Sequence, residues 1–338
     1  MPKCLVIKPT MTLKTVLHNK YNTTMTKTRL KSLNVLLFLI CLLFLGFTLT
    51  ACSSDDNGEQ GSGQNYNGRK LRQLTINDVP LTRATLTESG SALAAKWKTG
   101  DAATYINLSL LLQNVENYST LTASSSEEVS TLNGNVYCTV GDEIAVVYPA
   151  VTPATGNGAY TVSLSGQTGT LDNVATRYHY VYGMADVTDV TETTATAYVS
   201  AMKPLLAVCK FIFKDGNGSM IAVKTLKIGY GTSDKVGYPQ TATVTPFKKS
   251  SGMGYEIVSS DDIEAVPDSP SGLLTVRLDN ETSDGVYVAL FPGGESGNKN
   301  DFYFSVTNST GNYNGTAKAI LKAGKYYPVT LSLSNSTN

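Results

Sequence analysis

The feature that most constrains the fold is a series of short strand-like runs, each ended by a turn signal. The runs 136–140 and 144–148 are separated by Gly141-Asp142, and Asn133-Gly134 just before them is a hairpin signal. Val, Ile, Thr and Tyr favour strands, whereas Gly, Asn and Asp favour the tight turns between them. Few stretches have the 3.6-residue period of a helix. The pattern continues to the C-terminus and predicts an all-β chain of the sandwich class.

The strand-rich part is long enough for two domains of about 130 residues each. We place an N-terminal β-sandwich domain at residues 74–200 and a C-terminal one at residues 201–338. The chain has 19 Tyr, one Trp and two His. Tyrosine suits half-buried strand faces, because its ring packs while its hydroxyl stays in water. Composition therefore supports two tandem β-sandwich domains.

A secretory signal is predicted before this part. Basic residues, the apolar core Val35–Phe47 and a small-residue end follow the order of such a signal. The end, Leu49-Thr50-Ala51-Cys52, resembles the lipobox of bacterial lipoproteins, which implies a lipid on Cys52 and removal of residues 1–51 as a signal peptide. The alternative is a membrane-spanning helix, for which the core is short. Met25 begins a more compact signal than Met1 does, so Met25 is a second candidate start of the protein.

Residues 52–73 are predicted to be a flexible tether, since they are rich in Gly, Ser, Asn and acidic residues up to Gly68. The acidic cluster at 53–56 resembles the export signal of Bacteroidetes surface lipoproteins, which implies the outer face of the outer membrane; a solvated linker is the alternative. Arg69 and Arg72 are candidate sites of trypsin-like cleavage, because proteases cut exposed junctions most easily. An ordinary cluster of exposed charges is the other interpretation.

The charge balance argues against nucleic acid as a partner. The whole chain has 27 basic and 27 acidic residues, but seven of the basic residues and no acidic residue precede Cys52. The mature chain would keep 20 basic and 27 acidic residues, a net charge of −7. Binding of nucleic acid needs clustered Lys and Arg to neutralise phosphates. We therefore expect a surface that suits the cell exterior instead.

Catalytic residues, metal ligands and cofactor sites are not predicted. His179 is the one histidine after the signal, and we interpret it as a half-exposed strand residue because no partner for acid–base work accompanies it. The Cys and His residues lack metal-binding spacing. The glycine-rich segment 293–297 does not match a phosphate loop. The sequence thus favours a protein that is not an enzyme and has no cofactor.

Two cysteines, Cys138 and Cys209, remain in the β-rich part. Both lie in strand-like runs. One disulfide is possible in an oxidising compartment, and two separately buried thiols are the alternative. The distance between the two residues decides between these interpretations, and the sequence does not give it.

Several motifs in a fixed order resemble the fimbrillin family of Bacteroidetes, which are pilus subunits derived from lipoproteins. The resemblance covers roughly residues 74–333. The motifs are Trp97-Lys98-Thr99-Gly100-Asp101, Ile144–Pro149, Gln167-Thr168-Gly169-Thr170-Leu171 followed by Tyr178–Met184, Lys203–Val208 and Lys322–Leu331.

This resemblance implies two transthyretin-like β-sandwich domains in a cell-adhesive fimbrium. It also implies cleavage after an arginine near the first strand, here Arg69 or Arg72, with Leu74–Leu81 lying next to the exchanged region. Removal of that strand opens a groove that a strand of another pilus subunit fills. Such strand exchange pairs exposed backbone groups and covers an apolar slot.

The resemblance leaves the role within a pilus open. The sequence stops at Asn338, shortly after the strand-like run 326–333, whereas polymerising fimbrillins often continue with a donor strand pair. The protein is therefore a stalk, tip or accessory subunit, a pilus anchor, or a surface lipoprotein that does not polymerise. In the last case we expect glycan binding through exposed aromatic residues, such as those of the Tyr-rich loop that holds Tyr313. Host or bacterial surface ligands are further candidate partners.

Overall fold

The computed structural model describes residues 66–80, 85–89, 92–249, 255–295 and 298–336. The predicted signal peptide, the lipidation residue Cys52 and most of the tether lie outside these residues. Within them strands predominate, which confirms the all-β prediction. None of the helices in the described part of the chain is long and apolar enough to cross a bilayer.

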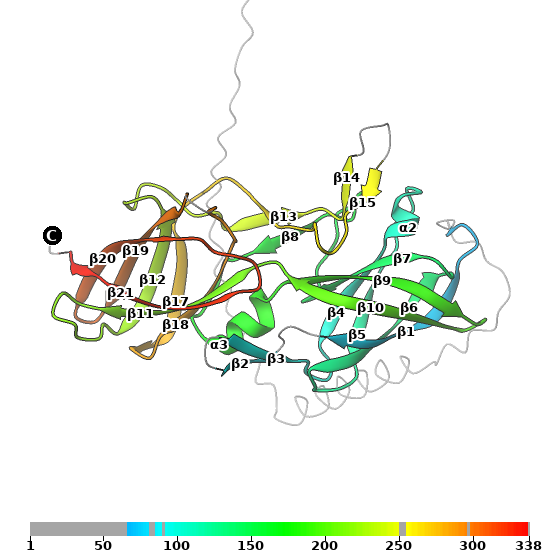
Figure 1. Cartoon of the computed structure of the whole chain (residues 1–338), viewed down its shortest axis with the longest axis horizontal. Coiled ribbons are helices and arrows are strands. Elements are labelled where there is room, and N and C mark those ends of the chain that lie inside the picture. Colours follow the sequence, from blue (N-terminus) through cyan, green and yellow to red (C-terminus); the bar gives the residue numbers. More distant parts are fainter. Residues whose placement is uncertain (1–65, 81–84, 90–91, 250–254, 296–297, 337–338) are drawn as a thin grey trace, which may run out of the picture. The chain divides into compact units, whose positions relative to one another are not determined.

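The first half forms a closed barrel, where stacked sheets were expected (Figure 1). The strands pair in the order β1-β10-β9-β7-β4-β5-β6, and β1 pairs with β6 to close the ring. Their bounds are β1 (Lys70–Pro80), β4 (Ala102–Asn107), β5 (Tyr118–Ala123), β6 (Val129–Cys138), β7 (Glu143–Tyr148), β9 (Val181–Val190) and β10 (Thr194–Pro204). Closure follows because β1 bonds to neighbours on both sides, which leaves the ring without a free edge there.

The second half has two sheets whose side chains share one apolar core. One sheet has the order β18 (Val286–Leu290), β11 (Ala207–Lys214), β21 (Tyr326–Ser332). The other has the order β17 (Leu274–Thr282), β12 (Val223–Tyr230), β19 (Asn300–Asn308), β20 (Gly311–Ala319), β22 (Ser334–Asn335). Phe211 of β11 meets Phe304 of β19 edge to face, with ring centroids 5.1 Å apart. Alternating buried residues on both strands explain why these faces come together.

Shorter elements lie beside these sheets. They are the hairpin β2 (Thr85–Ser89) and β3 (Ala92–Lys96), the sheet β16 (Val266–Pro267), β13 (Thr241–Val244) and β8 (Tyr160–Ser163), the pair β14 (Phe247–Lys249) and β15 (Tyr255–Ile257), the helices α2 (Leu108–Leu111) and α3 (Leu171–Asn173), and a π-helical turn at Val174–Tyr178. The β8–β13 pair joins strands from the two predicted domains. The division at residue 200 stays a prediction.

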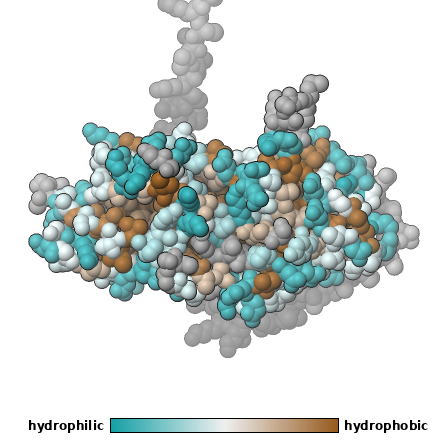
Figure 2. Space-filling view, viewed as in Figure 1, coloured by the Kyte–Doolittle hydropathy of each residue, from teal (hydrophilic) through white to brown (hydrophobic). Residues whose placement is uncertain are grey.

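The outer surface in view is mainly hydrophilic. Hydrophobic residues form small separate patches among polar ones on the face drawn in Figure 2. Large apolar side chains that are exposed include Leu71 at 54% and Val266 at 58%, on different strands. Single exposed apolar residues are normal on a folded protein and mark no binding surface by themselves.

Gly237 is expected to tolerate no larger residue. A Cβ at this position would lie 2.6 Å from the backbone nitrogen of Gly272 and 2.9 Å from its oxygen. Gly237→Ala should therefore lower the free energy of unfolding by about 1–3 kcal/mol, as overpacking does. Gly216→Ala is the matched control, because a Cβ there meets no atom within 4 Å. Urea unfolding measures both variants, and equal midpoints for the two would contradict the close approach.

The two cysteines of the β-rich part are free thiols in separate apolar clusters. Cys138 lies in the barrel core, and Cys209 lies in the core of the second half. Of the two interpretations drawn from the sequence, separately buried thiols is the correct one.

Burial is expected to make both thiols unreactive in the folded protein. It raises the pKa of Cys138 to about 11 and raises the pKa of Cys209 as well, so neither forms the reactive thiolate near pH 8. Iodoacetamide should leave both unlabelled until the protein is unfolded in urea. Mass spectrometry of the peptides that carry each cysteine measures this. Rapid labelling of Cys138 in the folded protein would contradict the burial.

Candidate functional site

The candidate site is strand β1 together with the residues that lead into it. β1 pairs with β6 antiparallel, from Lys70 opposite Cys138 to Pro80 opposite Val129, and with β10 in parallel over residues 73–77. Its apolar side chains Leu74, Ile76 and Val79 are fully buried in the barrel core. One short segment therefore supplies both the backbone bonds that close the barrel and part of its core.

A bulge in β1 keeps its apolar residues facing inward. The register with β6 shifts between Ile76 and Val79, and Asp78 has a φ of 51°. The shift places both Ile76 and Val79 in the core although three positions separate them, whereas a regular strand would turn one outward. Asp is among the residues that tolerate such a left-handed conformation.

Trp97 fixes this end of β1 from the neighbouring loop. Its side chain is 1% exposed, and its indole Nε1–H donates to the backbone oxygen of Val79 at 3.0 Å. The ring also meets Tyr148 edge to face, with centroids 5.3 Å apart. An edge-to-face pair of this kind stabilises the fold beyond the apolar burial of the two rings. Trp97 therefore contacts β1 directly and reports its position.

Arg69, just before β1, forms a buried ion pair with Asp142. Its Nε donates to the two carboxylate oxygens at 3.0 and 2.8 Å, and its Nη2 donates to Oδ1 at 2.6 Å. The side chains are 9% and 2% exposed. The hydrogen bonds to Asp142 raise the pKa of Arg69, although burial opposes this. The bidentate hydrogen bonding offsets part of the cost of burying the two side chains.

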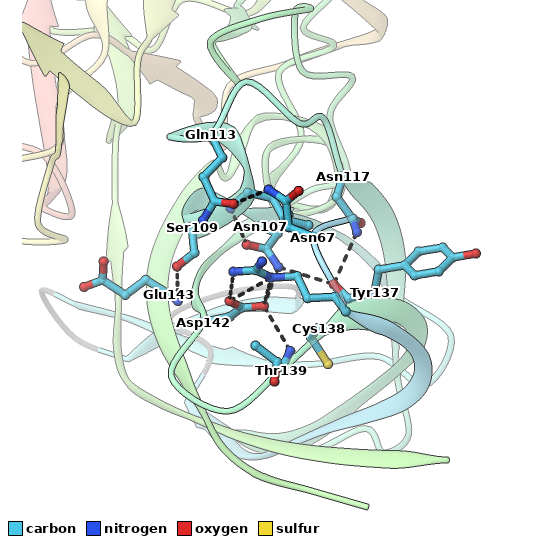
Figure 3. Close-up of polar contacts among 12 residues, drawn as sticks. Asn67, Asn107, Ser109, Gln113, Asn117, Tyr137, Cys138, Thr139, Asp142 and Glu143 are labelled. Carbon is cyan, nitrogen blue, oxygen red and sulfur yellow. Dashed lines mark hydrogen bonds and ion pairs between the residues drawn. The ribbon is translucent and has the colours of Figure 1, made fainter. Parts of the chain in front are cut away.

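The carboxylate of Asp142 is held by two further donors. Asn107 Nδ2 donates to Oδ2 at 2.9 Å, and the backbone N–H of Thr139 donates to the same oxygen at 3.0 Å (Figure 3). Asp142 lies in the turn between β6 and β7, where Gly141 has a φ of 81°. The predicted turn thus places the Asp142 carboxylate in a buried position at the end of the barrel. Both oxygens of this buried group are hydrogen-bonded, as its burial requires.

Arg72, the second predicted cleavage residue, is also buried. It is 8% exposed, its Nε donates to the backbone oxygen of Thr191 at 2.7 Å, and its Nη1 donates to the backbone oxygen of Cys138. The interpretation of both arginines as exposed charges is therefore wrong. The expectation that they lie beside the first strand holds: Arg69 precedes β1 and Arg72 is within it.

A polar groove lies where β5 and β6 separate on the barrel wall. These strands pair only at Thr122 and Ala123 of β5, and beyond them side chains bridge the gap: Ser119 Oγ donates to the Asn135 oxygen at 2.9 Å. The groove has a volume of ≈ 290 Å³ and is lined by Tyr66, Leu71, residues 116–119 and residues 135–137. The Tyr66 ring stacks on Tyr137 at 3.9 Å between centroids and 7° between planes.

A second cavity, apolar and ≈ 240 Å³ in volume, lies in the second half between the strands β20 and β21. Phe211, Phe302 and Leu331 are among its lining residues. Within the described residues β21 pairs with β11 alone, and β20 meets β22 only at Tyr313 and Asn314. The open sides of the two strands flank the cavity.

His179 differs from its predicted setting. It is 1% exposed and follows the π-helical turn, whereas a half-exposed strand residue was expected. In the described part of the chain, no group of three His, Cys, Asp or Glu side chains could hold a metal ion.

No protein-family model matches the sequence, and the comparison with curated proteins finds no match. The chain is similar in structure to a protein from Bacteroides uniformis assigned to cell adhesion (16% identity, TM-score 0.47, 80% of this chain and 94% of that one). It is also similar to a fimbrial assembly protein from Parabacteroides distasonis (11%, 0.40, 78% and 90%). A third similar structure is the tip fimbrial protein Mfa3 from Porphyromonas gingivalis with a C-terminal truncation (10%, 0.39, 75% and 83%).

The proteins of similar structure thus include fimbrial proteins, the class that the sequence resembles. At these identities and TM-scores, the comparisons assign no particular role to this chain.

Proposed function

We propose that the protein is a fimbrillin-like, cell-adhesive subunit of a fimbrium that assembles by strand exchange and catalyses no reaction. The observation that carries the proposal is the position of β1, which closes the barrel through both of its edges and buries three apolar side chains. The sequence motifs of the fimbrillins support it. Lipidation of Cys52 would anchor the protein at the outer face of the outer membrane before assembly.

The exchange would proceed at the place that β1 occupies. Without β1, the facing edges of β6 and β10 would expose unpaired backbone groups, and the apolar barrel core beneath β1 would be uncovered. A strand from another pilus subunit would satisfy both, and the contact would be long-lived without covalent chemistry. The finer assignment of two transthyretin-like domains at 74–200 and 201–338 is part of this proposal.

The site of cleavage decides whether β1 leaves. A cut after Arg69 or Arg72 would leave Leu74, Ile76 and Val79 attached to the rest of the barrel. A cut that releases the whole strand has to fall after Pro80, and the next arginine in the sequence is Arg83. Cleavage at Arg69 or Arg72 would therefore trim the tether, and strand exchange would require a cut at or near Arg83.

The test is the N-terminus and mass of the protein recovered from outer membranes and from sheared surface material. High-mass sheared material that begins at Ala84 supports strand release and polymerisation. A chain that begins at Lys70 or Gln73 points to trimming that leaves the buried residues of β1 in the barrel. A lipidated chain that begins at Cys52 and is found only as a membrane monomer would contradict the stalk role and favour an anchor or a surface lipoprotein.

The polar groove favours glycan binding as a second candidate function. The stacked pair of Tyr66 and Tyr137 offers an aromatic face, and Glu116 and Asn135 offer hydrogen-bonding groups beside it. Mobility in gels that contain polysaccharide tests this function. Tyr137→Ala should abolish any retardation of the chain, while Tyr198→Ala, at an exposed tyrosine on β10, should not.

A further inference from the structure

The segment that leads into β1 is held at the end of the barrel by its two arginines. The guanidinium of Arg69 is bonded to Asp142, and that of Arg72 is bonded to backbone oxygens of Thr191 and Cys138. The backbone of this segment is engaged as well, because Lys70 begins the ladder with β6. At both predicted cleavage sites the arginine side chain and the neighbouring backbone are therefore already hydrogen-bonded within the barrel.

An arginine-specific protease needs these same groups. Such an enzyme inserts the arginine side chain into an acidic specificity pocket of its own. It also needs the backbone around the scissile bond to be accessible, and proteolysis of a folded protein follows the population of the locally opened form. The bonds after Arg69 and Arg72 can therefore be cut only while the start of β1 is detached.

We infer that Asp142 controls proteolysis at this junction by holding Arg69 in the closed position. Its carboxylate is the partner to which the junction is fixed, and Asn107 and Thr139 keep that carboxylate in place. The biological purpose of this control rests on the proposed function, since it would keep the tether attached to β1 until the subunit is ready for assembly. The protection of the Arg69 bond by Asp142 can be measured on the uncleaved chain, without any assembly.

Digestion of the folded chain with an arginine-specific protease, which does not cut after Lys70, tests the inference, with the cut sites identified by mass spectrometry over time. Asp142→Asn keeps the size of the side chain but removes its charge. We expect it to speed cleavage after Arg69 by about tenfold or more, because the open population rises. Glu192→Gln is the matched control: Glu192 pairs with Lys70 at the same junction, but the two side chains are 78% and 54% exposed. Its rate should equal that of the original chain.

Arg69→Gln tests the pair from its other side. It removes the cleavage residue itself, so the rate is measured after Arg72, and we expect that rate to rise. Cleavage after Arg277, in β17 of the second half, and a shift in the emission of Trp97, in the barrel core, together report loss of the whole fold in either variant. Acceleration confined to Arg69 and Arg72 supports the inference.

Two results would overturn it. One is an unchanged rate at the junction in both Asp142→Asn and Arg69→Gln. The other is an equal acceleration after Arg277, which would show that the pair stabilises the whole fold instead of the junction. Neither result bears on strand exchange, which the N-termini of assembled material test separately.

Discussion

A chain from which β1 has been cut and removed is expected to lose its closed barrel. Burial of Leu74, Ile76 and Val79 contributes about 1.5–3 kcal/mol for each side chain. The sum is comparable with the whole stability of a small domain, about 5–15 kcal/mol. The fluorescence of Trp97 measures the loss, because Trp97 is the one tryptophan in the chain and bonds to Val79 of β1. Its emission should shift to longer wavelength.

Addition of a peptide with the sequence of residues 70–80 should restore the original emission. A peptide with Ile76→Asp should fail to do so, because it would bring an unpaired carboxylate into the core. A peptide with Asn77→Asp is the matched control, since Asn77 is exposed on the same strand, and it should restore the emission. Unchanged emission after removal of β1 would contradict the assigned role of the strand.

Local sequence signals predict many of the strands because they depend on neighbouring residues, although the hairpin turn predicted at Asn133-Gly134 is wrong: both residues lie inside β6. The predicted run 144–148 lies within β7, and the run 136–140 overlaps the end of β6. The predicted turn between them is present, with Gly141 in the left-handed region that favours glycine. Alternation of side chains and turn chemistry are both properties of adjacent positions, so they are visible in a single sequence.

Closure of the barrel could not be predicted in the same way. It requires β1 to pair in parallel with β10, where Gln73 lies opposite Thr194. Nothing in either strand alone specifies a partner so distant in the chain. The burial of polar residues could not be predicted either. Arg69 resembles an exposed charge in the sequence, because its partner Asp142 lies 73 positions away. The sequence marks Asp142 only as part of the turn pair Gly141-Asp142.

Replacement of Trp97 is expected to be among the most destabilising single changes in the barrel. Trp97→Ala removes a fully buried ring that packs against Tyr148 and a donor to the Val79 oxygen. The expected loss in the free energy of unfolding is about 3–5 kcal/mol, as for other buried aromatic residues replaced by alanine. Urea unfolding followed by circular dichroism measures it, since the variant has no tryptophan.

Trp97→Phe separates the two contributions of this side chain. It keeps an aromatic ring near Tyr148 but leaves the Val79 oxygen without its donor, which costs about 1–3 kcal/mol. The loss for phenylalanine should therefore be smaller than that for alanine. Tyr198→Ala, at a residue 56% exposed on β10, should change stability by no more than about 0.5 kcal/mol. If Trp97→Ala were as mild as Tyr198→Ala, Trp97 would not hold β1 against the barrel, and its fluorescence could not report the strand's release.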